Sequence, residues 1–119
     1  MNILFIHYDP GIKEEIDEFL MTQKGTGFFA ENTEHAIRIL NETAIDLVVL
    51  KITNLRDAAI LKYINDYYKD LEVYIMASKE YDDIISVFSK GHYKLFPQPL
   101  KISELKRNIE QRKPIKNEP

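Results

Sequence analysis

The sequence predicts an α/β fold in which five parallel strands form a doubly wound sheet with helices on both faces. The first observation is the run from Asp46 to Ile52, whose branched apolar side chains lie on both faces of an extended chain, as in a central strand of a parallel sheet. The second is that each apolar run is followed by residues at helical spacing. Strands that alternate with helices pair in parallel through right-handed crossovers, which gives a (βα)5 order.

Each element has its own signal in the sequence. The predicted strands are Ile3–Ile6, Phe28–Ala30, Asp46–Ile52, Val73–Ala77 and Tyr93–Phe96. The predicted helices begin after Pro10-Gly11, at the N-cap Asn32-Thr33, at Ala58 after a polar bridge from Asn54 to Asp57 (ending at Tyr68), after Ser78 (ending at Gly91) and near Ile102. Gly25-Thr26-Gly27 is interpreted as a turn, because a phosphate-binding loop would precede a helix. The domain is expected to cover residues 1–112, with 113–119 as a polar tail or linker that leads to a further domain.

Composition excludes several classes of protein. The 119 residues suit about one domain, and 45% are hydrophobic with a mean hydropathy of -0.31. A net charge of -3 gives no electrostatic reason for nucleic-acid binding, and the absence of cysteine excludes disulfides and thiol catalysis. The start of the chain lacks the pattern of a signal peptide, and no run approaches the roughly 20 apolar residues of a membrane span. We therefore expect a cytoplasmic protein.

Polar and aromatic residues follow the ends of the predicted strands, where open parallel sheets place their ligands. These residues are His7, Tyr8, Asp9, Lys51, Ala77, Ser78 and Gln98. The sheet edge is therefore expected to combine two rings, a carboxylate, an ammonium group, small side chains and an amide.

The order and spacing of the segments resemble the receiver (CheY-like) domain of two-component response regulators over about 112 residues. The resemblance is carried by Ile3–Ile6, Asp46–Leu50, Val73–Met76 and Gly91–Pro99. It implies the strand order 2-1-3-4-5. It also implies that the Gln98-Pro99 peptide bond is cis, as the matching bond commonly is in that family.

This chain departs from the receiver pattern at the positions that carry the family's phosphorylation chemistry. The acidic pair falls on His7 and Tyr8, and only Asp9 keeps an acid in the third place. The phosphoacceptor falls on Lys51 and the lysine on Gln98. The hydroxyl residue falls on Ala77, although Ser78 follows it. A lysine cannot form an acyl phosphate, and its charge repels the Mg²⁺ that carboxylates would hold. The resemblance is therefore to an atypical receiver, for which we expect no aspartyl phosphorylation, no catalytic residue, no metal and no cofactor.

Three groups of residues allow more than one interpretation. Lys51 would be a catalytic amine if its pKa were lowered, but an ion pair with Asp9, which would fix the site in one state, is favoured. His7 would be a metal ligand or general base, but packing against Tyr8 is favoured because no second histidine has ligand spacing. The tyrosines of the third predicted helix suit a contact patch or internal packing equally: Tyr63, Tyr67 and Tyr68.

By resemblance, the partner surface of a receiver is formed by its fourth helix, fifth strand and fifth helix. In this chain the candidate residues are Tyr81, Asp82, Lys90, Tyr93, Lys94, Lys106 and Arg107. Acidic residues on one helix and basic residues on the other suit a reciprocal two-fold contact, and they also suit an ordinary solvated surface.

Two functions follow as hypotheses. The first is a phosphorylation-independent receiver-like module that acts in signal transduction or transcription control by contacting a protein partner, an output domain or a second copy of itself. The alternative is a small flavodoxin-like domain that binds a metabolite or anion at the sheet edge beside Lys51, His7 and Tyr8. Neither hypothesis involves nucleic acid or membrane binding by this domain.

Overall fold

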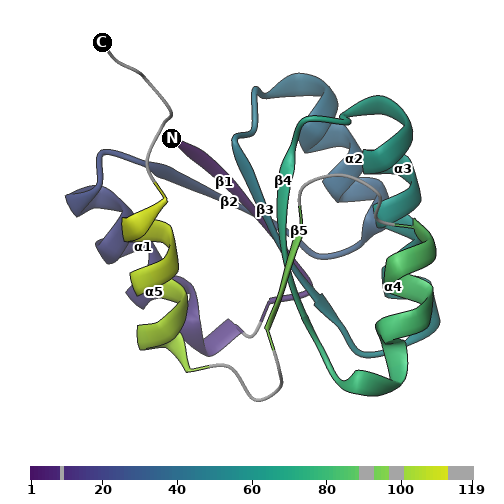
Figure 1. Cartoon of the computed structure of the whole chain (residues 1–119). Coiled ribbons are helices and arrows are strands. Elements are labelled where there is room, and N and C mark those ends of the chain that lie inside the picture. The colour runs from purple at the N-terminus through teal and green to yellow at the C-terminus, as the bar shows by residue number, and fades with distance from the viewer. Residues whose placement is uncertain (9, 89–92, 97–100, 113–119) are drawn as a thin grey trace, which may run out of the picture.

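Five parallel strands form one sheet in the order β2-β1-β3-β4-β5, with helices on both of its faces (Figure 1). The computed structural model describes residues 1–8, 10–88, 93–96 and 101–112. The strands are β1 (Asn2–Ile6), β2 (Thr26–Ala30), β3 (Leu47–Ile52), β4 (Glu72–Ala77) and β5 (Tyr93–Phe96). The helices are α1 (Lys13–Thr22), α2 (Thr33–Glu42), α3 (Ala59–Tyr67), α4 (Asp82–Phe88) and α5 (Ile102–Gln111). The predicted fold class and strand order are confirmed.

The strand β3 lies in the middle of the sheet because it is apolar on both faces. Its neighbours are β1 and β4, with Leu4 beside Val48 and Val49 beside Tyr74. Alternate residues point to opposite faces of a strand. One face of β3 contributes to the hydrophobic core under α2, α3 and α4, and the other to the core under α1 and α5.

Figure 1 shows these two layers, with α1 and α5 on one side of the sheet and α2, α3 and α4 on the other. The buried residues of α1 and α5 are Ile16, Leu20, Leu105 and Ile109, the positions at which helical spacing places one apolar face. Each fully buried Leu or Ile contributes roughly 2 kcal/mol relative to an exposed one. No helix in the described ranges has the length and apolar character needed to cross a bilayer.

The predicted start of α2 is confirmed at its cap. Asn32 has an extended backbone, and its side-chain oxygen accepts a hydrogen bond from the backbone N–H of His35 at 2.8 Å. This bond satisfies one of the N–H groups that a helix start leaves without a partner. The sequence signal and the local geometry therefore agree.

The interpretation of Gly25-Thr26-Gly27 as a turn is wrong for its last two residues. Thr26 and Gly27 belong to β2, which pairs with β1 from its first residue. The chain reverses one step earlier, at Lys24, which has φ 55 and ends α1 by donating its N–H to the Met21 carbonyl. Gly27 allows close packing, because a Cβ there would lie 3.1 Å from Leu20 Cδ1, and the Leu20 side chain would have to shift.

The polar segment after β3 also differs from the prediction. Residues expected to bridge to a helix at Ala58 form a 3-10 turn, η2 (Leu55–Ala58), and α3 begins after it. A second such turn, η3 (Lys79–Tyr81), precedes α4. These two turns shape the sheet edge described next.

Candidate functional site

The carboxyl ends of β1, β3 and β4 lie side by side, and this sheet edge carries the candidate site. The register sets Ile6 beside Leu50 and Ile52 beside Ala77. Lys51 is therefore the penultimate residue of β3, and the chain leaves the sheet only at Thr53. The loops that follow these three strands consequently meet at one edge.

Asp57 is the centre of this edge, although the sequence interpretation did not include it. Among the described residues it is the one charged side chain classed as buried, with 5% of its surface exposed. Its Oδ2 accepts hydrogen bonds from the Thr53 N–H at 2.8 Å, the Thr53 hydroxyl at 2.9 Å and the Asn54 N–H at 3.3 Å. The Asn54 side chain in turn accepts from the N–H of Asp57 at 3.2 Å, which completes a capping box. These bonds supply the partners that a buried carboxylate requires.

His7 contacts the same carboxylate from β1. Its Nε2 lies 3.1 Å from Asp57 Oδ1, and its side chain is 26% exposed. The backbone of His7 has φ 58, a left-handed conformation that costs roughly 1–3 kcal/mol for a residue with a Cβ. The expected packing of His7 against Tyr8 stays a prediction; the Tyr8 ring packs edge-on against Phe29, with ring centroids 4.8 Å apart.

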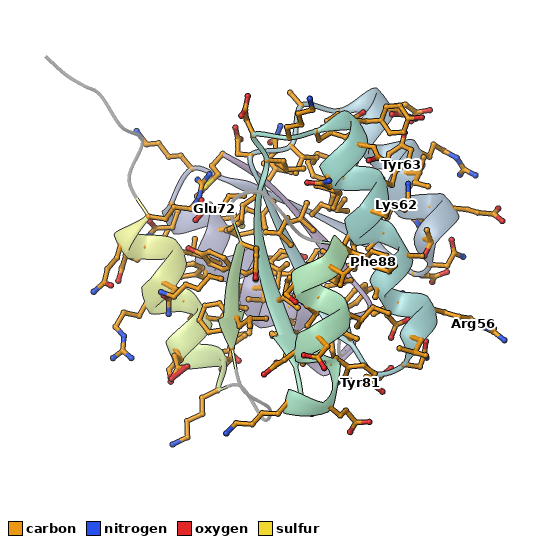
Figure 2. The ribbon with its side chains drawn as sticks, turned by 45° about the vertical axis from the view of Figure 1, so that its right-hand side comes forward. Arg56, Lys62, Tyr63, Glu72, Tyr81 and Phe88 are labelled. Atoms are coloured by element: carbon orange, nitrogen blue, oxygen red, sulfur yellow. The ribbon has the colours of Figure 1, made fainter. Side chains whose placement is uncertain are left out.

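Thr53 connects this cluster to the start of α4. Its carbonyl oxygen accepts a hydrogen bond from the Tyr81 hydroxyl at 2.8 Å, so the half-buried Tyr81 ring leans from η3 toward the end of β3. Figure 2 shows Tyr81 at the end of α4 nearest the sheet edge, with Arg56 projecting outward from the neighbouring turn. Ala77 is 7% exposed, and the hydroxyl of Ser78 donates to Glu80 Oε1 at 3.3 Å.

Lys51 lines a hollow of about 340 Å³ at this edge. The lining residues are His7, Tyr8, Ala30, Glu31, Lys51 and Thr53. In the part of the chain that the structure describes, no carboxylate oxygen lies within 4.0 Å of the half-buried Lys51 amine. The structure therefore brings together His7, Tyr8 and Lys51, three of the residues expected at the sheet edge.

Several expectations lie outside the described residues. Asp9 and Gln98 of the sheet edge and Lys90 of the partner surface are among them. The ion pair between Lys51 and Asp9 therefore stays a prediction, as does the cis peptide at Gln98-Pro99. The tail, residues 113–119, also lies outside the described ranges.

Among the described residues, no three side chains of histidine, aspartate or glutamate form a group that could hold a metal ion. His35 lies in the first turn of α2, whereas the contact with Asp57 is made by His7.

The candidate partner surface on α4, β5 and α5 is only partly available. The hydroxyl of Tyr81 is engaged inward, as described above. Lys106 extends toward α1, where its Nζ lies 2.5 Å from Glu15 Oε2 and 5.9 Å from the centre of the Phe19 ring. Lys94 donates to Asn108 Oδ1 at 2.6 Å. Asp82 and Arg107 are exposed.

Two exposed apolar side chains on this surface were missed as candidate contact residues. Val87 of α4 is 60% exposed, and Leu95 of β5 is 43% exposed. Tyr93 is half-buried on the same strand. We call Val87 and Leu95 the apolar pair. The buried residue of this short helix is Ile85.

The three tyrosines of the third predicted helix mainly join α3 to α2. The hydroxyls of Tyr63 and Tyr68 donate to Asn41 Oδ1 at 3.0 and 2.6 Å, and Tyr68 also donates to the Leu40 carbonyl. Tyr67 is 69% exposed and stacks at a tilt on Tyr63, 4.8 Å between centroids. Tyr63 and Tyr68 therefore have a packing role.

One signal in the sequence could have located the missed carboxylate. Asn54 and Asp57 have the three-residue spacing of a capping box, which places an acidic side chain over the start of a helix. That spacing does not reveal that His7 would approach from β1, because the contact joins residues 50 positions apart in a register that only the sheet defines.

The fold is that of a receiver-like α/β domain, and the comparisons with known proteins agree at the level of the fold. No family model and no curated protein sequence matches the chain. Among solved structures, the chain is similar to a response regulator receiver domain from Clostridium thermocellum, with 22% identity, a TM-score of 0.72, and coverage of 92% of this chain and 90% of that one.

Two further solved structures show how widely this fold is used. The response regulator TrrA from Thermotoga maritima, in complex with Mg²⁺ and BeF, has 24% identity and a TM-score of 0.69, with 92% and 96% of the two chains covered. NtrX from Brucella abortus, in complex with ADP, has 22% identity and a TM-score of 0.71. The similarity covers 92% of this chain, which corresponds to 26% of the NtrX chain.

A fourth similar structure is described as a redox sensor of streptococci that evolved from two-component response regulators. It has 14% identity and a TM-score of 0.73, with 92% of this chain and 49% of that chain covered. At these identities the comparisons establish the receiver fold alone.

Proposed function

We propose that this chain is a receiver-like regulatory module that acts through protein–protein contact in the cytoplasm and is not switched by aspartyl phosphorylation. The observation that carries the proposal is Lys51, a lysine near the end of the central strand, where the receiver pattern has its phosphoacceptor. An acyl phosphate needs a carboxylate nucleophile, and an ammonium group cannot supply it.

The buried carboxylate of this sheet edge, Asp57, does not restore that chemistry. Asp57 is 5% exposed, and its Oδ2 already accepts three hydrogen bonds. A nucleophilic oxygen must reach the phosphorus atom of a donor, so this buried and bonded group is a poor acceptor. The neighbour from streptococci supports the general idea, because its description gives a response-regulator fold the role of a redox sensor.

The partner in this proposal is a second copy of the chain, bound through α4, β5 and α5. The apolar pair supports it, because Val87 and Leu95 are exposed, and the elements proposed to form the contact also carry the exposed acidic Asp82 on α4 and the exposed basic Arg107 on α5. A patch that joins apolar area to both charge signs can contact its own copy across a two-fold axis. An output domain covalently linked beyond this domain is compatible with the same surface.

The dimer is tested by sedimentation equilibrium of the wild-type chain and three variants. We expect the mass of the wild type to rise with concentration, and Val87→Lys and Leu95→Lys each to weaken association at least about tenfold, because each buries a charge in the contact. Met21→Lys is the matched control, because Met21 is an exposed apolar residue of α1, 76% exposed. A strictly monomeric wild type at high concentration, or equal loss in the control, would contradict the dimer.

The absence of phosphorylation has a separate test. Beryllium fluoride with Mg²⁺ imitates a phosphoryl group bound to a carboxylate. We expect its addition to leave the amide NMR signals of residues 50–53 and 77–78 unchanged. Shifts that saturate at these residues would overturn the claim, whatever the oligomeric state.

The hollow beside Lys51 favours a second candidate, a flavodoxin-like domain that binds an anion or anionic metabolite. Lys51, His7 and Tyr8 line the same space, as that alternative requires, although Glu31 contributes an opposing carboxylate. Inorganic phosphate should then raise the melting temperature through binding to the folded state. Lys51→Met should abolish the rise and the exposed Lys69→Met should retain it. No rise at millimolar phosphate would reject this candidate.

A further inference from the structure

A continuous chain of polar contacts crosses the sheet edge from the residue after β1 to the turn before α4. It passes through four residues in the order His7, Asp57, Thr53 and Tyr81. We propose that these four residues, called the latch below, hold η3 against the end of β3 and couple the conformation of β1's end to the start of α4.

The first half of the latch is set by the buried carboxylate. Asp57 Oδ2 accepts from both the N–H and the hydroxyl of Thr53, so the residue after β3 is held at two points. Its other oxygen, Oδ1, faces His7 Nε2 at 3.1 Å. Moving the His7 ring would leave part of a buried carboxylate without a partner, and the turn that carries Asp57 would have to adjust.

The second half of the latch reaches the proposed partner surface. Tyr81 donates to the carbonyl of Thr53, the same residue that Asp57 holds. Tyr81 is the last residue of η3, and α4 begins at Asp82. A shift of Thr53 would therefore move the first turn of α4. The same helix carries Val87 of the apolar pair, further along.

Two features of His7 indicate that the end of β1 could change its conformation. The backbone of His7 is left-handed at φ 58, and its N–H reaches the Ala30 carbonyl only at 3.5 Å. A residue held in a sparsely populated conformation stays there because its surroundings hold it. His7 and Thr53 also both line the hollow beside Lys51, so the latch is accessible from the sheet edge.

The latch is tested by amide hydrogen exchange of Asp82–Phe88 in dilute protein. We expect Tyr81→Phe, which removes only the hydroxyl, to raise exchange in α4 about fivefold while leaving α2 and α5 unchanged. Tyr63→Phe is the matched control, because the hydroxyl that it removes donates to Asn41 of α2. It should leave α4 exchange as in the wild type.

Coupling along the latch requires a double-mutant cycle. His7→Asn shortens the side chain but keeps a residue that tolerates a left-handed backbone. We expect it to raise exchange in α4 in the wild-type background and to add little in the Tyr81→Phe background. No effect on α4, or the same effect with and without the Tyr81 hydroxyl, would overturn the latch.

The double-mutant cycle also tests the latch independently of the proposed dimer. Exchange is measured at concentrations at which sedimentation gives a monomer, so a failure of dimerisation does not affect the readout. Conversely, if the chain dimerises but His7→Asn leaves hydrogen exchange in α4 unchanged, the latch is rejected and the dimer is not.

Discussion

At the scale of single residues, the two charged side chains Lys51 and Asp57 of the sheet edge differ in burial and in their partners. Lys51 is half-buried beside a hollow, with no carboxylate within ion-pair distance among the described residues, whereas Asp57 is buried and fully engaged. A charge that lines an open hollow is stabilised by water, but a buried charge depends on protein partners. The two residues therefore differ sharply in what their removal should cost.

Asp57→Ala should lower the free energy of unfolding by about 3 kcal/mol, because it leaves the N–H groups of Thr53 and Asn54 without their acceptor. Urea unfolding followed by circular dichroism measures the loss. The exposed carboxylate of Asp70 provides the control, and Asp70→Ala should change stability by no more than about 0.5 kcal/mol. Equal small losses in both variants would contradict the central role of Asp57.

Tyr74 gives the stability a dependence on alkaline pH. Burial raises the pKa of Tyr74 above the ordinary value of 10.0; the Glu72 carboxylate acts in the same direction, and Arg112 opposes it. The folded state therefore keeps the phenol proton at a pH at which the unfolded chain loses it. This contribution is fully present below pH 10.0 and is lost as the pH rises through the folded-state pKa.

We therefore expect the free energy of unfolding of Tyr74→Phe to fall less steeply with pH than that of the wild type above about pH 9.5. Urea unfolding at a series of pH values measures both slopes. Tyr67→Phe is the control, because Tyr67 is 69% exposed, and its curve should run parallel to the wild type. A parallel curve for Tyr74→Phe as well would show that burial of Tyr74 has no alkaline effect.

At the scale of elements, local signals specify where helices start better than where turns fold. Asn32 caps α2 as its sequence position indicates, because the bond to His35 involves only neighbours in the chain. Residues 55–57, expected as a bridge, instead form part of η2, and strand β2 begins two residues before its aromatic core. The first residues of β2 are strand because β1 pairs with them, and that information is not local.

Replacing Asn32 by Ala should cost about 1 kcal/mol of stability, because the His35 N–H loses its side-chain acceptor. Asn32→Asp should retain the cap and stay close to the wild type. Thermal and urea unfolding both report the difference, and hydrogen exchange should place it in the first turn of α2. Equal stability of the Ala and Asp variants would show that the cap contributes nothing.

At the scale of the whole molecule, Arg112 closes the structure by joining the end of α5 to the beginning of the sheet. Its Nε contacts the Glu72 carboxylate, its Nη2 donates to the Asp46 carbonyl at 2.9 Å, and its Nη1 lies 3.1 Å from Met1 Sδ. Figure 2 shows Glu72 at the end of the sheet opposite Tyr81. Contacts of Arg112 therefore stabilise one end of the sheet, and the contact of Tyr81 with Thr53 stabilises the other.

Arg112→Ala should destabilise the fold by about 1.5 kcal/mol, since it removes a charge-assisted contact and a hydrogen bond to a carbonyl. The exposed Arg107 of the same helix is the matched control, and Arg107→Ala should have little effect on unfolding. If the two arginine variants unfold at the same urea concentration, α5 is held by its apolar face alone.

The sequence by itself determined the fold class, the order of the elements and the cap of α2. Each of these depends on hydrophobic periodicity, on neighbours in the chain or on the identity of one side chain. Tertiary structure alone decided that His7 meets Asp57, that Tyr81 reaches Thr53 and that Lys106 turns away to Glu15. The physical reason is that these contacts join distant segments, whose side chains approach one another only after the sheet has set its register and the helices have packed on it.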